Sequence, residues 1–162
     1  MRLSARVDYA LRAVAELAAS SPAPAGSVDG SPVGAKLVTA DRLAAAQQIP
    51  PKFLESILLQ LRRGGVVVAQ RGPEGGYRLA RPAADISLAE IIRVIDGPLA
   101  NVRGQRPEEL GYHGAASALQ DVWIALRASE RLILETVTIE DVVTGELPER
   151  VRDLVADPRA WV

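Results

Sequence analysis

The sequence predicts a mainly α-helical fold with a small β-wing, and three observations lead to this fold class. Two helical stretches, 39–48 and 51–63, are separated by a short turn that contains two consecutive prolines. Two short stretches with strand character, 66–69 and 77–80, then enclose a glycine-rich loop. Further on, 114–136 has apolar residues at spacings of three and four, as in a long helix. The order helix, turn, helix and wing predicts a winged helix-turn-helix, followed by a long dimerisation helix.

The first helix is expected from Ser4 to about Ala19. Ser4 is a suitable N-cap, because its side-chain oxygen can accept from a free amide of the first turn. The apolar stripe of this helix consists of Val7, Leu11, Val14 and Leu17. The next stretch, 20–37, is made of Pro, Gly, Ser and Ala with few large apolar residues. It cannot bury enough surface to offset the entropy of ordering, so we expect a mobile loop.

Local signals set the limits of the helix pair. Thr39 is expected to N-cap an alanine-rich helix that ends near Gln48, and Pro50 and Pro51 are expected to start the next one. Gly64-Gly65 should end that helix, since glycine adopts the left-handed C′ conformation at little cost. The expected buried stripe of the second helix is Phe53, Leu54, Ile57, Leu58 and Leu61.

The polar face of helix 51–63 is the candidate for DNA recognition. In a helix-turn-helix the second helix enters the major groove, led by its N-terminal residues. Lys52 can donate to guanine, Glu55 can accept from cytosine, and Ser56 can do either. The alternative is a solvated helix face. Arg71 in the wing loop is the expected contact to the minor groove or a phosphate. Further candidate DNA-contacting residues are Gln60, Arg62, Arg63, Arg2 and Thr39.

Composition narrows the function classes. The chain has 162 residues and a net charge of −1, but residues 1–82 carry +5 and residues 83–162 carry −6. A basic half that coincides with the winged helix suits a protein with one DNA-binding end. With no cysteine, the chain can form neither disulfides nor thiolate-held metal sites. No apolar run approaches the ~20 residues of a bilayer span, and the N-terminus lacks a signal-peptide pattern. We therefore expect a cytoplasmic protein without membrane contact.

The second half opens with another helix and a long loop. Ser87-Leu88-Ala89-Glu90 has the pattern of a capping box, with Ile86 and Ile91 as the hydrophobic staple, and the helix should close at Asp96. The loop 98–114 is long for a compact domain, which predicts either a functional loop or a plain surface connection. His113 lies near Glu108 and Glu109, but a lone loop histidine is more often neither a metal ligand nor a pH-dependent group. We therefore expect no metal site and no cofactor.

The helix expected over 114–136 has more apolar surface than a small domain can cover, which predicts a homodimer. Packing within one chain is the alternative. A short capped helix is expected after Thr138, and the tail either docks or is disordered. The expected division is 1–97 for DNA binding, 98–114 for the loop, 115–145 for dimerisation helices and 146–162 for the tail. The candidate dimer-interface residues are Leu119, Val122, Trp123, Leu126 and Ile133.

Several segments together resemble the Rrf2 family of bacterial transcription regulators. They are SARVDYALRAVAELA, LESILLQLRRGG, the wing QRGPEGGYRLAR and ISLAEIIRVIDGPL, and the resemblance covers most of residues 1–136. It implies a winged-helix homodimer on a near-palindromic operator of double-stranded DNA. It also implies that helix 51–63 and the Arg71 wing make the DNA contacts.

The sequence departs from the family in one respect. Many members hold an iron–sulfur cluster through three cysteines in the loop that corresponds to 98–114, and this loop has none. Some relatives use an acid of the first helix as a further ligand; Asp8 stands there, but without the cysteines it is a structural or surface residue. The sequence thus predicts a regulator, acting as a repressor, controlled by a small metabolite or a protein partner. The alternative is a winged-helix module for protein assembly without DNA binding. No nucleophile–base pattern points to an enzyme.

Overall fold

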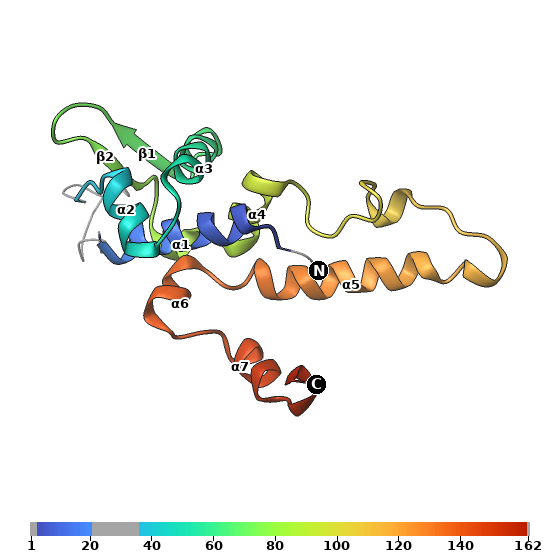
Figure 1. The fold of residues 1–162 in the computed structure, drawn as a ribbon. Coiled ribbons are helices and arrows are strands. Elements are labelled where there is room, and N and C mark those ends of the chain that lie inside the picture. The colour runs from blue at the N-terminus through green and yellow to red at the C-terminus, as the bar shows by residue number, and fades with distance from the viewer. Residues whose placement is uncertain (1–2, 21–35, 162) are drawn as a thin grey trace.

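The computed structural model describes residues 3–20 and 36–161, and it shows a helical protein with one small antiparallel sheet (Figure 1). Arg2 and most of the expected mobile loop lie outside the described residues. The helices are α1 (Ala5–Ser20), α2 (Ala40–Gln47), α3 (Pro51–Arg63), α4 (Leu88–Asp96), α5 (Leu119–Leu134), α6 (Ile139–Thr144) and α7 (Glu149–Ala156). The strands are β1 (Val67–Gln70) and β2 (Gly76–Leu79). Short 3-10 turns occur at Ala83–Asp85, Pro107–Glu109, Gly114–Ala116 and Pro158–Trp161.

Helix α1 lies at the centre of the core, in contact with α2, α3, α4 and α6. Its apolar stripe is fully buried at Val7, Val14 and Leu17. The Ser4 hydroxyl accepts from the amide of Val7 at 3.2 Å, which confirms the expected N-cap. Within residues 3–20 and 36–161, no helix combines the length and apolar character needed to cross a membrane.

The helix pair is bounded as the sequence predicts. Thr39 caps α2, and its side chain accepts from the amide of Arg42. After α3, Gly65 takes the left-handed conformation with φ +72°. Two hydrogen bonds, Val66 N to Leu61 O at 2.9 Å and Gly65 N to Arg62 O at 3.1 Å, complete a Schellman motif.

The β-wing is tied to the start of α2. Strands β1 and β2 pair antiparallel from Val67 opposite Leu79 to Gln70 opposite Gly76. Val38 adds a single bridge to Tyr77, through backbone hydrogen bonds of 2.9 and 2.8 Å. The wing therefore stands in a fixed position beside the helix pair.

The start of α4 differs from the expected capping box. The Ser87 side chain accepts from the amide of Glu90, as predicted, and both staple residues, Ile86 and Ile91, are buried. The Glu90 carboxylate, however, pairs with Arg81 instead of returning to the Ser87 amide. Arg81 also donates to the carbonyl of Gly65 at 3.1 Å. A charged partner has replaced the weaker backbone contact, and the pair joins the wing to α3 and α4.

Helix α5 is shorter than the sequence suggested. It begins at Leu119 instead of near Gly114, because a 3-10 turn at Gly114–Ala116 precedes it. At 1.5 Å per residue, its 16 residues span about 24 Å. Figure 1 shows α5 and the loop before it running together away from the core.

After α5 the chain returns to the core, where α6 packs on α1. Ile139 of α6 is fully buried, and its amide donates to Ile86 O at 2.9 Å. In return, Leu88 N at the start of α4 donates to Val137 O, just before α6, at 3.0 Å. Thr138 caps α6 with a capping box completed by Asp141. Helix α6 therefore belongs with α1–α4. The tail contains α7, set apart from the core (Figure 1).

Candidate nucleic-acid interface

Helix α3 presents one continuous solvent-facing arc. Its inner side is fixed by the buried Leu54, Ile57, Leu58 and Leu61. At about 100° per residue, six exposed side chains of the helix fall within an arc of about 120° on the opposite side. These exposed residues are Lys52, Glu55, Ser56, Leu59, Arg62 and Arg63. The structure therefore brings five of the predicted DNA-contacting residues onto one face.

Two residues of α3 do not follow the prediction. Phe53 was expected in the buried stripe, yet its side chain is 51% exposed. It lies on the flank of the helix, where its ring meets Tyr9 of α1 at a centroid distance of 6.2 Å. Gln60 lies on the same flank and accepts a 2.8 Å hydrogen bond from Arg6. Gln60 therefore joins α3 to α1, which does not support its expected place among the DNA contacts.

Leu59 was not among the predicted residues, yet it lies near the middle of the exposed arc and is 44% exposed. An apolar side chain there can contact a thymine methyl group in the major groove. Its position between Glu55 and Lys52 on the helical wheel was the available signal. It was overlooked because leucine on a helix is usually assigned to the core.

The wing loop begins with Arg71, which directly follows β1 and is exposed. Gly75 N donates to Gly72 O at 2.9 Å, so the loop contains a tight turn instead of an open seven-residue connection. Gly76 packs closely against the backbone of the segment before α2, and a Cβ at this position would be 2.7 Å from Val38 O. These backbone contacts hold the loop, while the Arg71 side chain remains in solvent.

Within the described residues, ion pairs do not neutralise the positive charge at the interface. No ion pair in residues 3–20 and 36–161 includes Lys52, Arg62, Arg63 or Arg71. Thr39 is exposed at the start of α2, where its side-chain oxygen already accepts from a backbone amide. Free cations around a helix face and a wing suit a polyanion such as DNA.

A second candidate region lies where the loop 97–110 meets α4 and α5. Leu99, Pro107 and Leu110 are buried and hold the loop. Glu108 pairs with Arg127, and Glu135 pairs with both Arg93 and Arg131. A backbone hydrogen bond and then the Arg127 guanidinium lower the pKa of Glu108. Hydrogen bonds from Arg93 and Arg131 lower the pKa of Glu135.

The predicted dimer residues lie on α5, a helix that has no fully buried residue within its own chain. Leu119, Val122 and Leu126 are 39, 52 and 45% exposed. Ile133 and Trp123 are half-buried, and the Trp123 Nε1 donates to the Tyr112 hydroxyl at 3.0 Å. One side of α5 thus contacts its own loop while an apolar side remains open.

The fold and the exposed face of α3 together define a winged helix-turn-helix protein. The sequence model of the Rrf2 family, described as iron-dependent transcriptional regulator, matches residues 3–145. The chain therefore belongs to the Rrf2 family of transcriptional regulators.

Relatives and solved structures agree with this assignment. The chain is 50% identical over 160 residues to Rv1287 of Mycobacterium tuberculosis, whose name places it among HTH-type transcriptional regulators; the match covers 99% of this chain and 92% of that protein. It is 30% identical to the HTH-type transcriptional regulator IscR of Cereibacter sphaeroides, covering 91% of this chain and 90% of the relative. The structure of T. potens IscR matches with a TM-score of 0.66 at 26% identity, over 90% of this chain and 88% of that one.

The family description raises the question of iron. A cluster of the family type needs thiolate ligands, and the sequence contains no cysteine. The single histidine, His113, is exposed in the loop. In the part of the chain that the structure describes, no three His, Asp or Glu side chains gather closely enough to hold a metal ion. The residues present do not fit a thiolate-held iron–sulfur cluster.

Proposed function

We propose that this regulator is a homodimer that binds double-stranded DNA at a near-palindromic operator and acts as a repressor without a thiolate-held cluster. A small metabolite or a protein partner controls it. The observation that carries the proposal is the exposed arc of α3, in which Lys52, Arg62 and Arg63 make no ion pair among the described residues. The Arg71 wing beside it supplies a second contact.

Within this arc the residues divide by position. Lys52, Glu55 and Ser56 lie in the first turns of α3, the part of a recognition helix that reads base edges. Arg62 and Arg63 lie in the last turn, so they suit phosphate contacts that carry no sequence information. Specificity and affinity should therefore respond to different substitutions.

Support for a dimer comes from the open apolar side of α5. A symmetric pair of such helices would cover Leu119, Val122 and Leu126 of both chains. The same symmetry would present two α3 helices to half-sites one helical turn apart, or a multiple of one turn. The operator should then be close to palindromic.

Selection of bound fragments from genomic DNA by the purified protein tests the proposal and supplies the operator. On that operator, Arg71→Ala should weaken binding, and Lys52→Ala should relax base preference at one position by about 1–3 kcal/mol. Arg152→Ala, an exposed change on α7, is the matched control and should leave both unchanged. Unaltered affinity and preference in both interface variants would remove these contacts from the proposal.

The alternative is a winged-helix module that assembles with other proteins and does not bind DNA. The acidic second half of the chain and the open side of α5 favour it. Salt distinguishes the two functions, because each phosphate contact should contribute about 0.9 to the slope of log affinity against log salt. A regulator that contacts DNA must show this slope, whereas an assembly module must show no DNA binding at all.

A further inference from the structure

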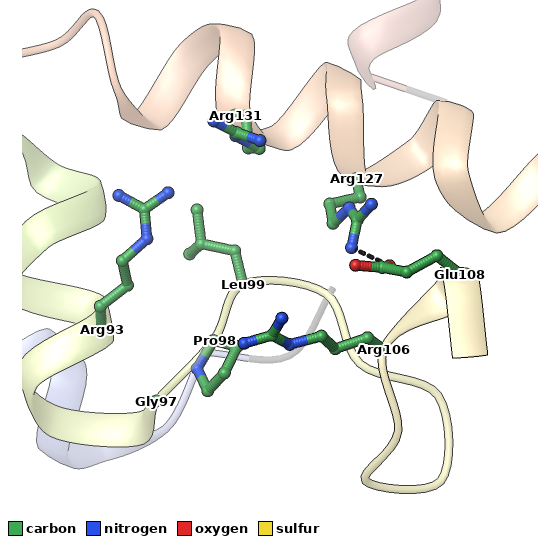
Figure 2. A pocket seen from close by; sticks show the side chains of 8 residues that line it. All are labelled: Arg93, Gly97, Pro98, Leu99, Arg106, Glu108, Arg127 and Arg131. Atoms are coloured by element: carbon green, nitrogen blue, oxygen red, sulfur yellow. Dashed lines mark hydrogen bonds and ion pairs between the residues drawn. The ribbon is translucent and has the colours of Figure 1, made fainter. Parts of the chain in front are cut away.

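A cavity of about 480 Å³ lies between α4, the loop after it and α5. Four arginines line it, contributed by all three elements: Arg93, Arg106, Arg127 and Arg131. Figure 2 shows their side chains around Leu99 and Pro98 of the loop. A volume of this size is within the range of small-molecule sites, about 300–1,000 Å³.

The charges around the cavity do not balance. Glu108 pairs with Arg127, and Glu135 pairs with both Arg93 and Arg131. Arg106 makes no ion pair with any residue in 3–20 or 36–161. Glu108 lines the cavity, whereas Glu135 does not line it and only pairs with two of its arginines. Among these groups, two carboxylates against four guanidinium groups leave a surplus of two positive charges. Such a surplus in a concave site favours an anion, because the like charges repel one another until one binds.

The cavity would remain open in a dimer formed through the apolar side of α5. Val122 belongs to that side, and Arg131 follows it by nine residues, about two and a half helical turns, so the two side chains point in opposite directions. Arg127 likewise faces the loop, where it pairs with Glu108. Arg127 lies about 100° from Leu126 and Arg131 lies opposite Val122, so the partner and the anion would use different sides of the same helix.

Guanidinium groups select the chemistry of the ligand. Each presents a planar fork of donors that matches a carboxylate or a phosphate with two parallel hydrogen bonds. Arginines from three separate elements converge here, so a ligand with two or more anionic groups can contact several of them at once. A ligand with a single carboxylate has only two oxygens and could not pair with all of them.

From these observations we infer that the cavity binds a small polyanion, a metabolite bearing two or more carboxylate or phosphate groups. The ligand displaces Glu108 or Glu135 from its arginine and joins the loop to α4 and α5. This inference gives a chemical class to the metabolite in the proposed function. Binding of the anion itself does not depend on DNA binding.

Isothermal titration calorimetry on the full chain tests the site, with citrate and inorganic pyrophosphate as probes at constant ionic strength. Citrate and pyrophosphate distinguish a polycarboxylate from a polyphosphate site, and acetate is the singly charged comparison. At least one of the two probes should bind, and acetate should not. Arg106→Gln should weaken that binding about tenfold, because it removes a charge-assisted hydrogen bond. The change leaves the backbone of the loop intact.

Arg103→Gln is the matched control, since it removes the same charge from the same loop but does not line the cavity. It should bind the probe as the parent protein does. The inference is overturned if neither probe binds better than acetate, or if both variants weaken binding equally. It is also overturned if Arg106→Gln weakens operator binding without any probe present, because Arg106 would then be a DNA contact. Failure to bind any DNA would refute the proposed function, while the calorimetric result would still decide the site.

Discussion

Truncation of Leu126 provides a quantitative test of the dimer. Fully burying a leucine side chain contributes about 1.5–3 kcal/mol. Leu126 is 45% exposed within one chain, so a partner can bury about half of it, or about 1 kcal/mol. In a two-fold symmetric dimer, Leu126 of each chain would lie in the interface, so the substitution removes this contribution twice. Leu126→Ala should therefore cost about 2 kcal/mol, which is about a 30-fold increase in the dimer dissociation constant.

Sedimentation velocity over a dilution series measures that constant directly. Leu154→Ala is a matched control, because Leu154 on α7 is also a leucine with 45% exposure. It should leave the dissociation constant unchanged. The predicted α5 dimer interface is refuted if the two variants shift the dissociation constant equally, or if Leu126→Ala does not shift it. A parent protein that is a monomer at all concentrations would refute it as well.

Three further predictions concern stability. Gly76→Ala should destabilise the fold by about 1–3 kcal/mol in urea unfolding, because its Cβ would overlap the facing backbone; Gly111→Ala, with open space around it, should be neutral. Gln48→Gly should stabilise by up to about 1 kcal/mol, because Gln48 has φ +52°; an unchanged urea midpoint would contradict this. Hydrogen bonding, chiefly from Arg93, lowers the pKa of Glu135 in the folded state below its unfolded pKa, which is near 4.5. The ionised Glu135 should therefore contribute fully to stability above that unfolded pKa, and the contribution should be lost as pH falls through the lower folded pKa. Chemical-shift titration of Glu135 measures this directly, and Arg93→Gln should move the midpoint upward.

Short-range signals in the sequence were sufficient for the winged helix. Thr39 and Ser87 cap their helices as expected, since capping depends on residues within one turn. Gly65 adopts the predicted left-handed conformation at the end of α3 for the same reason. Helix and wing limits were therefore predictable to within about two residues.

Contacts between distant segments were not predictable. Nothing near Gln60 in the sequence indicates that its side chain would accept a hydrogen bond from Arg6. Phe53 has the apolar character of a core residue, yet it packs on Tyr9 at the surface. The four arginines of the cavity are spread over 39 positions, from 93 to 131, and only the path of the loop brings them together. The apolar periodicity of a single helix predicts its buried side, but it does not predict which other segments contact the residues beside that buried side.

The return of α6 to the core makes the helical core that carries the wing discontinuous in sequence. The loop and α5 form an insertion that leaves after α4 and rejoins at Val137, where backbone hydrogen bonds tie the strand-like segments before α4 and α6 together. A fragment cut at residue 97 would expose Ile86 and lose Ile139 from the core. The loop and α5 are thus tied to the helical core at both ends of the insertion, and the ion pair between Arg93 and Glu135 adds a contact between α4 and the end of α5. Under the proposed function, a displacement of α5 would reach α3 through these shared attachments.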